Sequence, residues 1–278
     1  MLYEITCEII KLNHNIQHIK CILMNTHPRD SLIIFDSTKH NYTCNNLVGF
    51  TSVTGWVKTH FKHFDADSIV DKIMSSRNWS KSKYFGKTKE EIISGWTTNG
   101  YIASSLGTEM HKSIENYYNL TPDQRSDIVL TPLPGKIASL NLPEHFINFV
   151  KNNKHLRPFR SEWMIFDESI KIAGSVDMLF EHDDGSLIIY DWKRCKSIVK
   201  SSPFNAYATT DCIEHFPDTN FWHYALQLNM YKYIIESKYE KTVSKMVLLA
   251  LHPDLPTYVQ IPVPVISEMD ELVCKLRM

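Results

Sequence analysis

The sequence predicts an α/β domain, because strand-like and helix-like segments alternate along the chain. Residues 174–196 contain two apolar runs joined by a turn, which is the pattern of a β-hairpin. Residues 220–237 carry apolar side chains at helical spacing, which predicts a long amphipathic helix. Residues 244–252 and 257–265 then return to strand-like apolar runs. We therefore expect strands and helices to share one main domain.

The segments before the hairpin divide into a small N-terminal part and that main domain. Strand-like stretches separated by turn residues fill residues 2–48, so we expect a β-rich appendage at 1–48 and the main domain at 49–278. Elsewhere the pattern predicts helices at 52–61, 66–74, 88–119, from 142 onward and after 265, with a strand at 160–166.

Capping, glycine and proline signals set the expected ends of the helices. Thr88-x-x-Glu91 is a capping-box pattern that begins a helix, and Asn99-Gly100 interrupts the helical pattern before it resumes toward Asn119. The proline-rich stretch 120–142 is expected to be an irregular connector.

Composition excludes several classes of protein. The 278 residues are 43% hydrophobic and 22% charged, with a net charge of -1, so nucleic-acid binding would need a local basic patch. The 6 cysteines are scattered without a C-x-x-C pair, which argues against a zinc ribbon or a disulfide framework. No apolar run reaches the roughly 20 residues that span a bilayer. The first residues include Glu4 and Glu8 and lack a basic stretch, so we expect no signal or transit peptide and an intracellular location.

The hairpin carries the most informative charges. Because side chains alternate on a strand, Asp191 and Lys193 point to the same side and Trp192 to the other, while Asp177 on the first strand can face them. Two carboxylates and an ammonium gathered at one place are costly to bury unless a ligand uses them. A divalent metal beside a phosphate, with the lysine over the attacking water, is the natural use.

A basic and aromatic stretch, Ser75–Lys89, contains no acidic residue. Phosphates are bound by basic side chains and unpaired bases stack on aromatic ones, so this stretch suits single-stranded nucleic acid. A solvated loop whose aromatic residues dock on the core is the alternative. The candidate contacts are Arg77, Trp79, Lys81, Lys83, Tyr84 and Lys87.

Three further positions are ambiguous when taken singly. His111 lies in Gly107-Thr108-x-x-His111 on a predicted helix, where a histidine is usually structural but can be a metal ligand. Glu162 is an isolated acid on a predicted strand, where exposure to solvent is the common outcome. Gln227 and Tyr231 are four residues apart and share one face of the long helix.

The order of these features resembles the RecB-like branch of the PD-(D/E)XK nuclease superfamily, and within it the mitochondrial genome maintenance exonuclease and its relatives in large DNA viruses. The resemblance covers about residues 51–265. The features that carry it are Gly107-Thr108-x-x-His111, Glu162, Gly174-Ser175-Val176-Asp177, Asp191-Trp192-Lys193 and Gln227-x-x-x-Tyr231, with weaker support from Ser52-Val53-Thr54 and Tyr84-Phe85-Gly86-Lys87-Thr88.

The resemblance implies a restriction-endonuclease-like core, a central mixed sheet flanked by helices, that binds Mg²⁺ or Mn²⁺. It implies that Asp177, Asp191 and the carbonyl of Trp192 bind the metal, joined by His111 and, for a second metal or its water, Glu162. Lys193 would orient or deprotonate the attacking water, supported by Gln227 and Tyr231. Beside these motifs we also expect DNA contacts from Ser52, Arg194 and Lys196.

The resemblance also has limits. Some relatives carry an iron–sulfur cluster on late cysteines, but only Cys274 lies late here, so we expect no cluster. There is no G-x-x-x-x-G-K-[ST] motif, so we expect no nucleotide cofactor, and any helicase or replication factor would be a separate partner. We expect the protein to act in the cytoplasm or nucleus, which would be those of the host cell if the protein is viral. We expect DNA as its partner and no membrane.

These observations favour a metal-dependent DNA exonuclease that acts on single-stranded or end-bearing DNA in replication, repair or recombination. An endonuclease on RNA or branched DNA is the first alternative, because one fold serves many substrates. A nucleic-acid-binding module without catalysis is the second.

Overall fold

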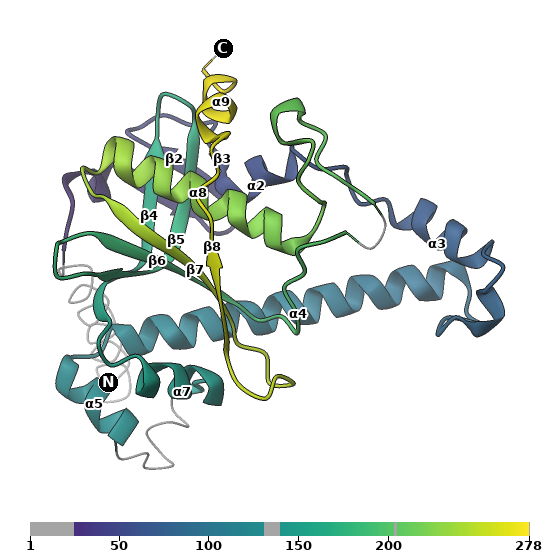
Figure 1. Cartoon of the computed structure of the whole chain (residues 1–278), viewed down its shortest axis with the longest axis horizontal. Coiled ribbons are helices and arrows are strands. Elements are labelled where there is room, and N and C mark those ends of the chain that lie inside the picture. Colours follow the sequence, from purple (N-terminus) through teal and green to yellow (C-terminus); the bar gives the residue numbers. More distant parts are fainter. Residues whose placement is uncertain (1–24, 131–139, 203–204, 278) are drawn as a thin grey trace, which may run out of the picture.

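A computed structural model of the chain describes residues 25–130, 140–202 and 205–277 (Figure 1). At its centre is a mixed sheet of six strands in the order β3-β5-β6-β7-β8, with β4 paired along the other edge of β5. The predicted central mixed sheet flanked by helices is confirmed. Its strands are β3 (Thr51–Ser52), β4 (Arg157–Asp167), β5 (Ile172–Glu181), β6 (Leu187–Lys193), β7 (Val243–Ala250) and β8 (Val259–Val263).

Strand directions set the position of the site. β5 runs antiparallel to both β4 and β6, whereas β6 and β7 are parallel. The β5–β6 pairing ends at Met178 and Tyr190, although β6 continues beside β7 as far as Lys193. β3 pairs with the same edge of β5 as β6 does, but only at residues 172–173. Within the described strands, the stretch of β5 between these two partners therefore has a free backbone edge.

Apolar residues cover both faces of the sheet, as strand alternation requires. One face packs against α2 (Val53–Lys58), α8 (Asn220–Lys238) and α9 (Met269–Cys274), whose buried side chains join those of Val176 and Leu248. The other face packs against the end of α4 (Lys89–Tyr118) and α7 (Glu144–Asn152), around Trp192 and Phe180. Strand alternation predicted that Trp192 would face away from Asp191 and Lys193 and pack in the core.

Helix α4 is a single helix of 30 residues, so it is about 45 Å long. The predicted capping box is confirmed, with both hydrogen bonds between Thr88 and Glu91 formed. The predicted interruption at Asn99-Gly100 is wrong. Gly100 is exposed and costs the helix only about 1 kcal/mol relative to alanine, which the cap at one end and the buried packing from Met110 onward outweigh.

The first half of α4 projects beyond the sheet and carries α3 (Ala66–Met74) at its far end (Figure 1). Lys89 forms ion pairs there with Asp67 and Asp71, at 3.2 and 2.8 Å. The segment between these helices contains a short 3-10 turn, Trp79–Lys81. It is therefore placed at the tip of a projecting arm.

The stretch 120–142 was expected to be irregular, but part of it is helical. Helix α5 spans Pro122–Leu130. Proline suits the first helical turn, where its missing N–H would have no helical partner, and Thr121 and Gln124 exchange side-chain to backbone hydrogen bonds of 3.3 and 3.0 Å around that turn. The proline was thus a helix start signal rather than a breaker.

The N-terminal hairpin consists of β1 (Ile33–Asp36) and β2 (Asn41–Cys44), preceded by a 3-10 turn, Pro28–Leu32. The strand predicted at the end of the appendage is confirmed by β1, while those predicted over residues 2–24 lie outside the described residues. The hairpin buries Ile33, Tyr42 and Cys44 against residues of β4 and β5. In the part of the chain that the structure describes, no helix has the length and apolarity to cross a membrane.

Candidate active site

Asp177 and Asp191 lie where β5 and β6 separate. Beyond the last pair, Met178 and Tyr190, no described strand reaches the backbone of Trp192 on the β5 side. Its N–H instead donates to Asp177 Oδ2 at 2.8 Å. Asp177 and Asp191 are both buried. The end of the ladder therefore creates the space in which two acidic side chains meet.

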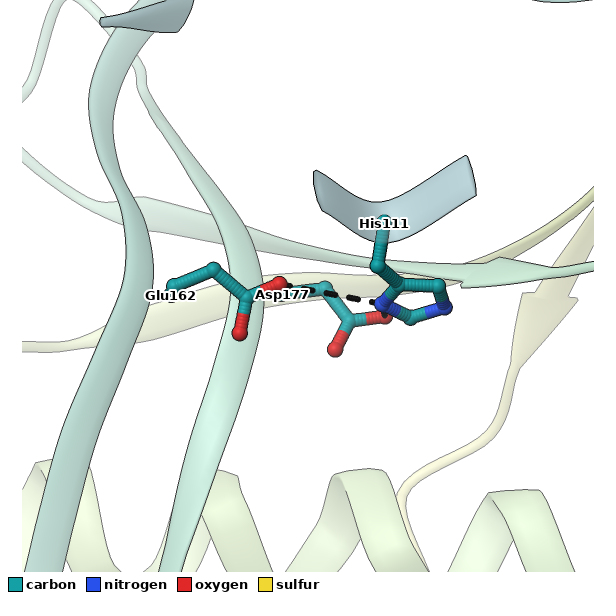
Figure 2. Close-up of side chains that lie close together, drawn as sticks. All are labelled: His111, Glu162 and Asp177. Carbon is teal, nitrogen blue, oxygen red and sulfur yellow. Dashed lines mark ion pairs between the residues drawn. The ribbon is translucent and has the colours of Figure 1, made fainter. Parts of the chain in front are cut away.

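His111 reaches this space from α4 (Figure 2). Its Nε2–H donates to the carbonyl oxygen of Trp192 at 2.9 Å, so Nδ1 faces the acids. Nδ1 lies 3.6 Å from Asp177 Oδ2 and 3.7 Å from Glu162 Oε1. Burial alone lowers the pKa of His111, but Asp177 and then Glu162 outweigh it and raise the pKa to about 9.

Glu162 completes the cluster from β4. Its backbone has a φ of +47°, a left-handed conformation that costs a non-glycine residue on the order of 1–3 kcal/mol. Ser175 Oγ donates to Glu162 Oε2 at 3.1 Å and holds the carboxylate beside His111. A strained backbone inside a regular strand indicates that the position of this carboxylate matters more than local stability.

The ligand atoms of His111, Glu162 and Asp177 all lie within 4.8 Å of one another. Carboxylate oxygens suit Mg²⁺ and Mn²⁺, and the imidazole nitrogen is also compatible with Mn²⁺. The donor set therefore fits a divalent cation. Two of the predicted metal ligands are arranged differently: the carbonyl of Trp192 accepts the proton of His111, and Asp191 faces Lys193.

Lys193 and Asp191 form an ion pair of 2.7 Å beside the cluster. Burial raises the pKa of Asp191 to about 6, against the opposing effect of Lys193. Burial also lowers the pKa of Lys193, but Asp191 and Asp177 outweigh it and the net pKa is raised. Lys193 is thus a cation at neutral pH, which suits the orienting part of its predicted role and not the deprotonation of water.

Helix α8 supports this ion pair. Lys193 Nζ donates to Gln227 Oε1 at 3.3 Å, and the amide of Gln227 donates to Asp191 Oδ1 at 3.3 Å and to the Tyr231 hydroxyl at 3.2 Å. The structure therefore brings the predicted Gln227 and Tyr231 next to Lys193. Tyr231 packs so closely on Gly174 that a Cβ there would lie 2.8 Å from Tyr231 Cε1.

One neighbour of Lys193 was not among the predicted site residues. Lys193 Nζ lies 4.3 Å from the centre of the Tyr224 ring, an arrangement that favours a cation over the ring face. Tyr224 precedes Gln227 by three residues, so the two side chains share a helix face. That spacing was the available signal.

The predicted contacts of the basic stretch lie apart from this cluster. The basic stretch is at the start of α4, and 23 residues of helix, about 35 Å, separate Thr88 from His111. Some of its residues dock locally, since the Tyr84 hydroxyl accepts from Trp96 Nε1 at 2.8 Å. Ser52 serves as the N-cap of α2, with Gly55 N donating to its Oγ at 3.0 Å.

Lys196 follows soon after the end of β6 and pairs with Asp254 at 2.6 Å. Arg194 directly follows β6 and lines a shallow pocket with Leu106 and His145. DNA binding by these two residues stays a prediction.

The mixed sheet carries an acid–imidazole cluster and a paired lysine at the point of strand divergence, which is compatible with a nuclease-type α/β fold. A family model described as the PD-(D/E)XK nuclease superfamily matches residues 81–275. The chain belongs to this superfamily, and the predicted fold is confirmed. A nuclease activity that depends on a divalent metal is what this family suggests.

Other comparisons add little. No curated protein matches the chain. A solved structure titled "Crystal structure of SSO0001" is similar at 18% identity and a TM-score of 0.28, over 61% of this chain and 70% of the other.

The packing of Tyr231 on Gly174 predicts a position-specific cost. Gly174→Ala should lower the free energy of unfolding by about 1–3 kcal/mol, because the new methyl would meet Tyr231 at 2.8 Å and Val53 at 3.0 Å. Gly107→Ala is the matched control, because nothing lies within 4 Å of a Cβ at that helical site. Urea denaturation compares the two. An equal effect of both substitutions would show that Gly174 is not packed as described.

Proposed function

We propose that this chain is a metal-dependent exonuclease of the RecB-like branch that hydrolyses phosphodiester bonds in DNA during replication, repair or recombination. The observation that carries the proposal is the meeting of His111, Glu162 and Asp177 beside the Lys193–Asp191 ion pair. The cluster offers a cation site and the ion pair a fixed positive charge. Each of them can stabilise the negative charge that develops on the phosphate during hydrolysis.

The proposed metal ligands are His111, Glu162 and Asp177, with Asp191 adjacent. A divalent cation held there would polarise the scissile phosphate and help to generate the nucleophile. The protein presets this geometry. Ser175 orients Glu162, the N–H of Trp192 orients Asp177, and the carbonyl of Trp192 fixes which nitrogen of His111 faces the acids.

Lys193 is proposed to orient the attacking water and to stabilise charge that develops on the phosphate. An ammonium has three N–H donors. Gln227 accepts from one of them and Asp191 holds the charge at 2.7 Å, so the ammonium has donor capacity left for the substrate. Because the pKa of Lys193 is raised, the group is protonated at neutral pH, which favours donation of a hydrogen bond over removal of a proton.

DNA is the proposed partner, bound in single-stranded or end-bearing form. The basic arm, Ser75–Lys89, supports this, because its exposed lysines can contact backbone phosphates away from the site. Preference for a free end rests on the order of motifs shared with exonucleases. A helicase or replication factor would act as a separate chain.

Removal of the lysine charge tests the catalytic proposal. Lys193→Ala should reduce cleavage of labelled DNA with Mg²⁺ or Mn²⁺ by on the order of 10²-fold or more, because a preorganised charge at the phosphate is removed. Lys245→Ala is the control, since Lys245 is an exposed lysine on the neighbouring strand β7. Wild-type rates in Lys193→Ala would rule out this role, and chelation should abolish cleavage in all variants.

Substrate topology separates exonuclease from endonuclease. We expect linear single strands to be degraded and closed single-stranded circles of the same sequence to survive. The measurement is gel analysis of both substrates with equal enzyme and metal. A nicked or linearised circle would favour the endonuclease alternative, and an RNA circle in the same series tests the choice of nucleic acid.

The basic arm predicts a salt effect. Replacing Lys81, Lys83 and Lys87 with alanine should weaken DNA binding and reduce the slope of log affinity against log salt by about 0.7 for each phosphate that is no longer neutralised. A triple variant of exposed lysines elsewhere, Lys39, Lys151 and Lys245, controls for net charge. Fluorescence anisotropy across salt concentrations gives both slopes. An identical change in the two variants would show that the arm is a solvated loop with no specific role in DNA binding.

A further inference from the structure

A cavity opens directly beside the cluster of proposed metal ligands. It has a volume of about 450 Å³ and lies between the N-terminal hairpin and strand β4. Glu162 and Ser175 belong to its wall and also to the proposed active site. A molecule held at the cluster through a phosphate would therefore have this cavity as its immediate neighbour.

Aromatic and apolar side chains of the hairpin form one wall. Phe35 and Tyr42 lie with ring centroids 4.7 Å apart, and Ile33 and Met164 continue the apolar surface. Burial, and then the charge of Glu162, raises the pKa of Tyr42 to about 12, so its hydroxyl stays neutral. The wall thus combines ring faces with a neutral hydroxyl near the site.

Most of the charges around the cavity are paired, and Glu162 adds a further carboxylate to its wall. Asp30 pairs with Arg160 at 2.6 Å and accepts from Trp163 Nε1 at 2.9 Å, and Glu115 pairs with Lys112 at 2.8 Å. The cation that the described residues contribute to the wall, Arg160, is therefore already engaged. Such a surface does not favour a phosphate. It suits a flat, neutral group that can stack and form hydrogen bonds.

We propose that the β1–β2 hairpin forms a nucleobase pocket for the nucleotide adjoining the scissile phosphate. This inference rests on the proposed function and adds a substrate contact to the same site. Stacking on Phe35 would hold the base, and the Tyr42 hydroxyl and the side-chain amide of Asn119 would meet its edge. A base must be unpaired to enter, so the pocket selects single-stranded DNA.

Base stacking can be followed without catalysis. Full-length Lys193→Ala protein is titrated into single-stranded oligonucleotides that carry 2-aminopurine at one position each, because the fluorescence of this base is quenched when it stacks. We expect quenching beyond that of free DNA at one position only, because one base stacks on an aromatic ring of the pocket. Adding Phe35→Ala should remove most of this quenching. Uniform fluorescence across all positions would overturn the pocket.

A matched variant separates stacking from general damage to the hairpin. Ile34 lies on the opposite side of β1 and is 66% exposed, so Ile34→Ala should keep the quenching. Phe35→Leu keeps apolar volume without a ring, and it should abolish quenching while unfolding at the same urea concentration as its parent. Equal quenching in the Phe35→Leu and Ile34→Ala proteins would also overturn the pocket.

Cleavage by the wild-type chain distinguishes the two proposals. Cleavage of intact DNA together with flat 2-aminopurine signals would contradict the pocket and leave the nuclease activity standing. Position-specific quenching that depends on Phe35, without metal-dependent cleavage by the wild type, would support the pocket and contradict the proposed activity.

Discussion

The separation of β5 from β6 is the constraint on which the site depends. While the two strands pair, their backbone groups satisfy one another, and after Met178 and Tyr190 they stop doing so. Buried N–H and C=O groups need partners. Trp192 finds them in Asp177 and His111, and these bonds fix a carboxylate and an imidazole at the same point. The unmet backbone bonding of one residue thus orients two of the proposed metal ligands.

A second constraint is electrostatic. Asp191 and Asp177 are buried together, and desolvation raises the pKa of each, with a smaller contribution from neighbouring carboxylates. Lys193 offsets this for Asp191, and His111 does so for Asp177. A buried ion pair gains little net stability over an apolar pair of similar volume. Retaining these charges therefore makes more sense as preparation for a phosphate and a cation than as a stabilising feature.

Sequence alone could predict the parts of this arrangement that follow from local periodicity. Strand alternation placed Asp191 and Lys193 on one side and Trp192 on the other, and helical spacing joined Gln227 to Tyr231. It could not predict that Asp191 would pair with Lys193 and stay outside the cluster of His111, Glu162 and Asp177, because this depends on where two strands diverge. The continuous α4 was missed for a related reason: tertiary packing from Met110 onward overrides a weak local signal at Gly100.

The N-terminal hairpin shows how a segment that is separate in sequence becomes part of a site. Asp30, just before β1, binds both Arg160 and Trp163 of β4, which lie on either side of Glu162 in the sequence. Strand β4 therefore both anchors the hairpin and places Glu162, with its strained backbone, in the cluster. This attachment sets where Tyr42 and Phe35 lie relative to the proposed metal ligands. If it persists when DNA binds, a base entering this cavity would lose its own freedom without the added cost of ordering the hairpin.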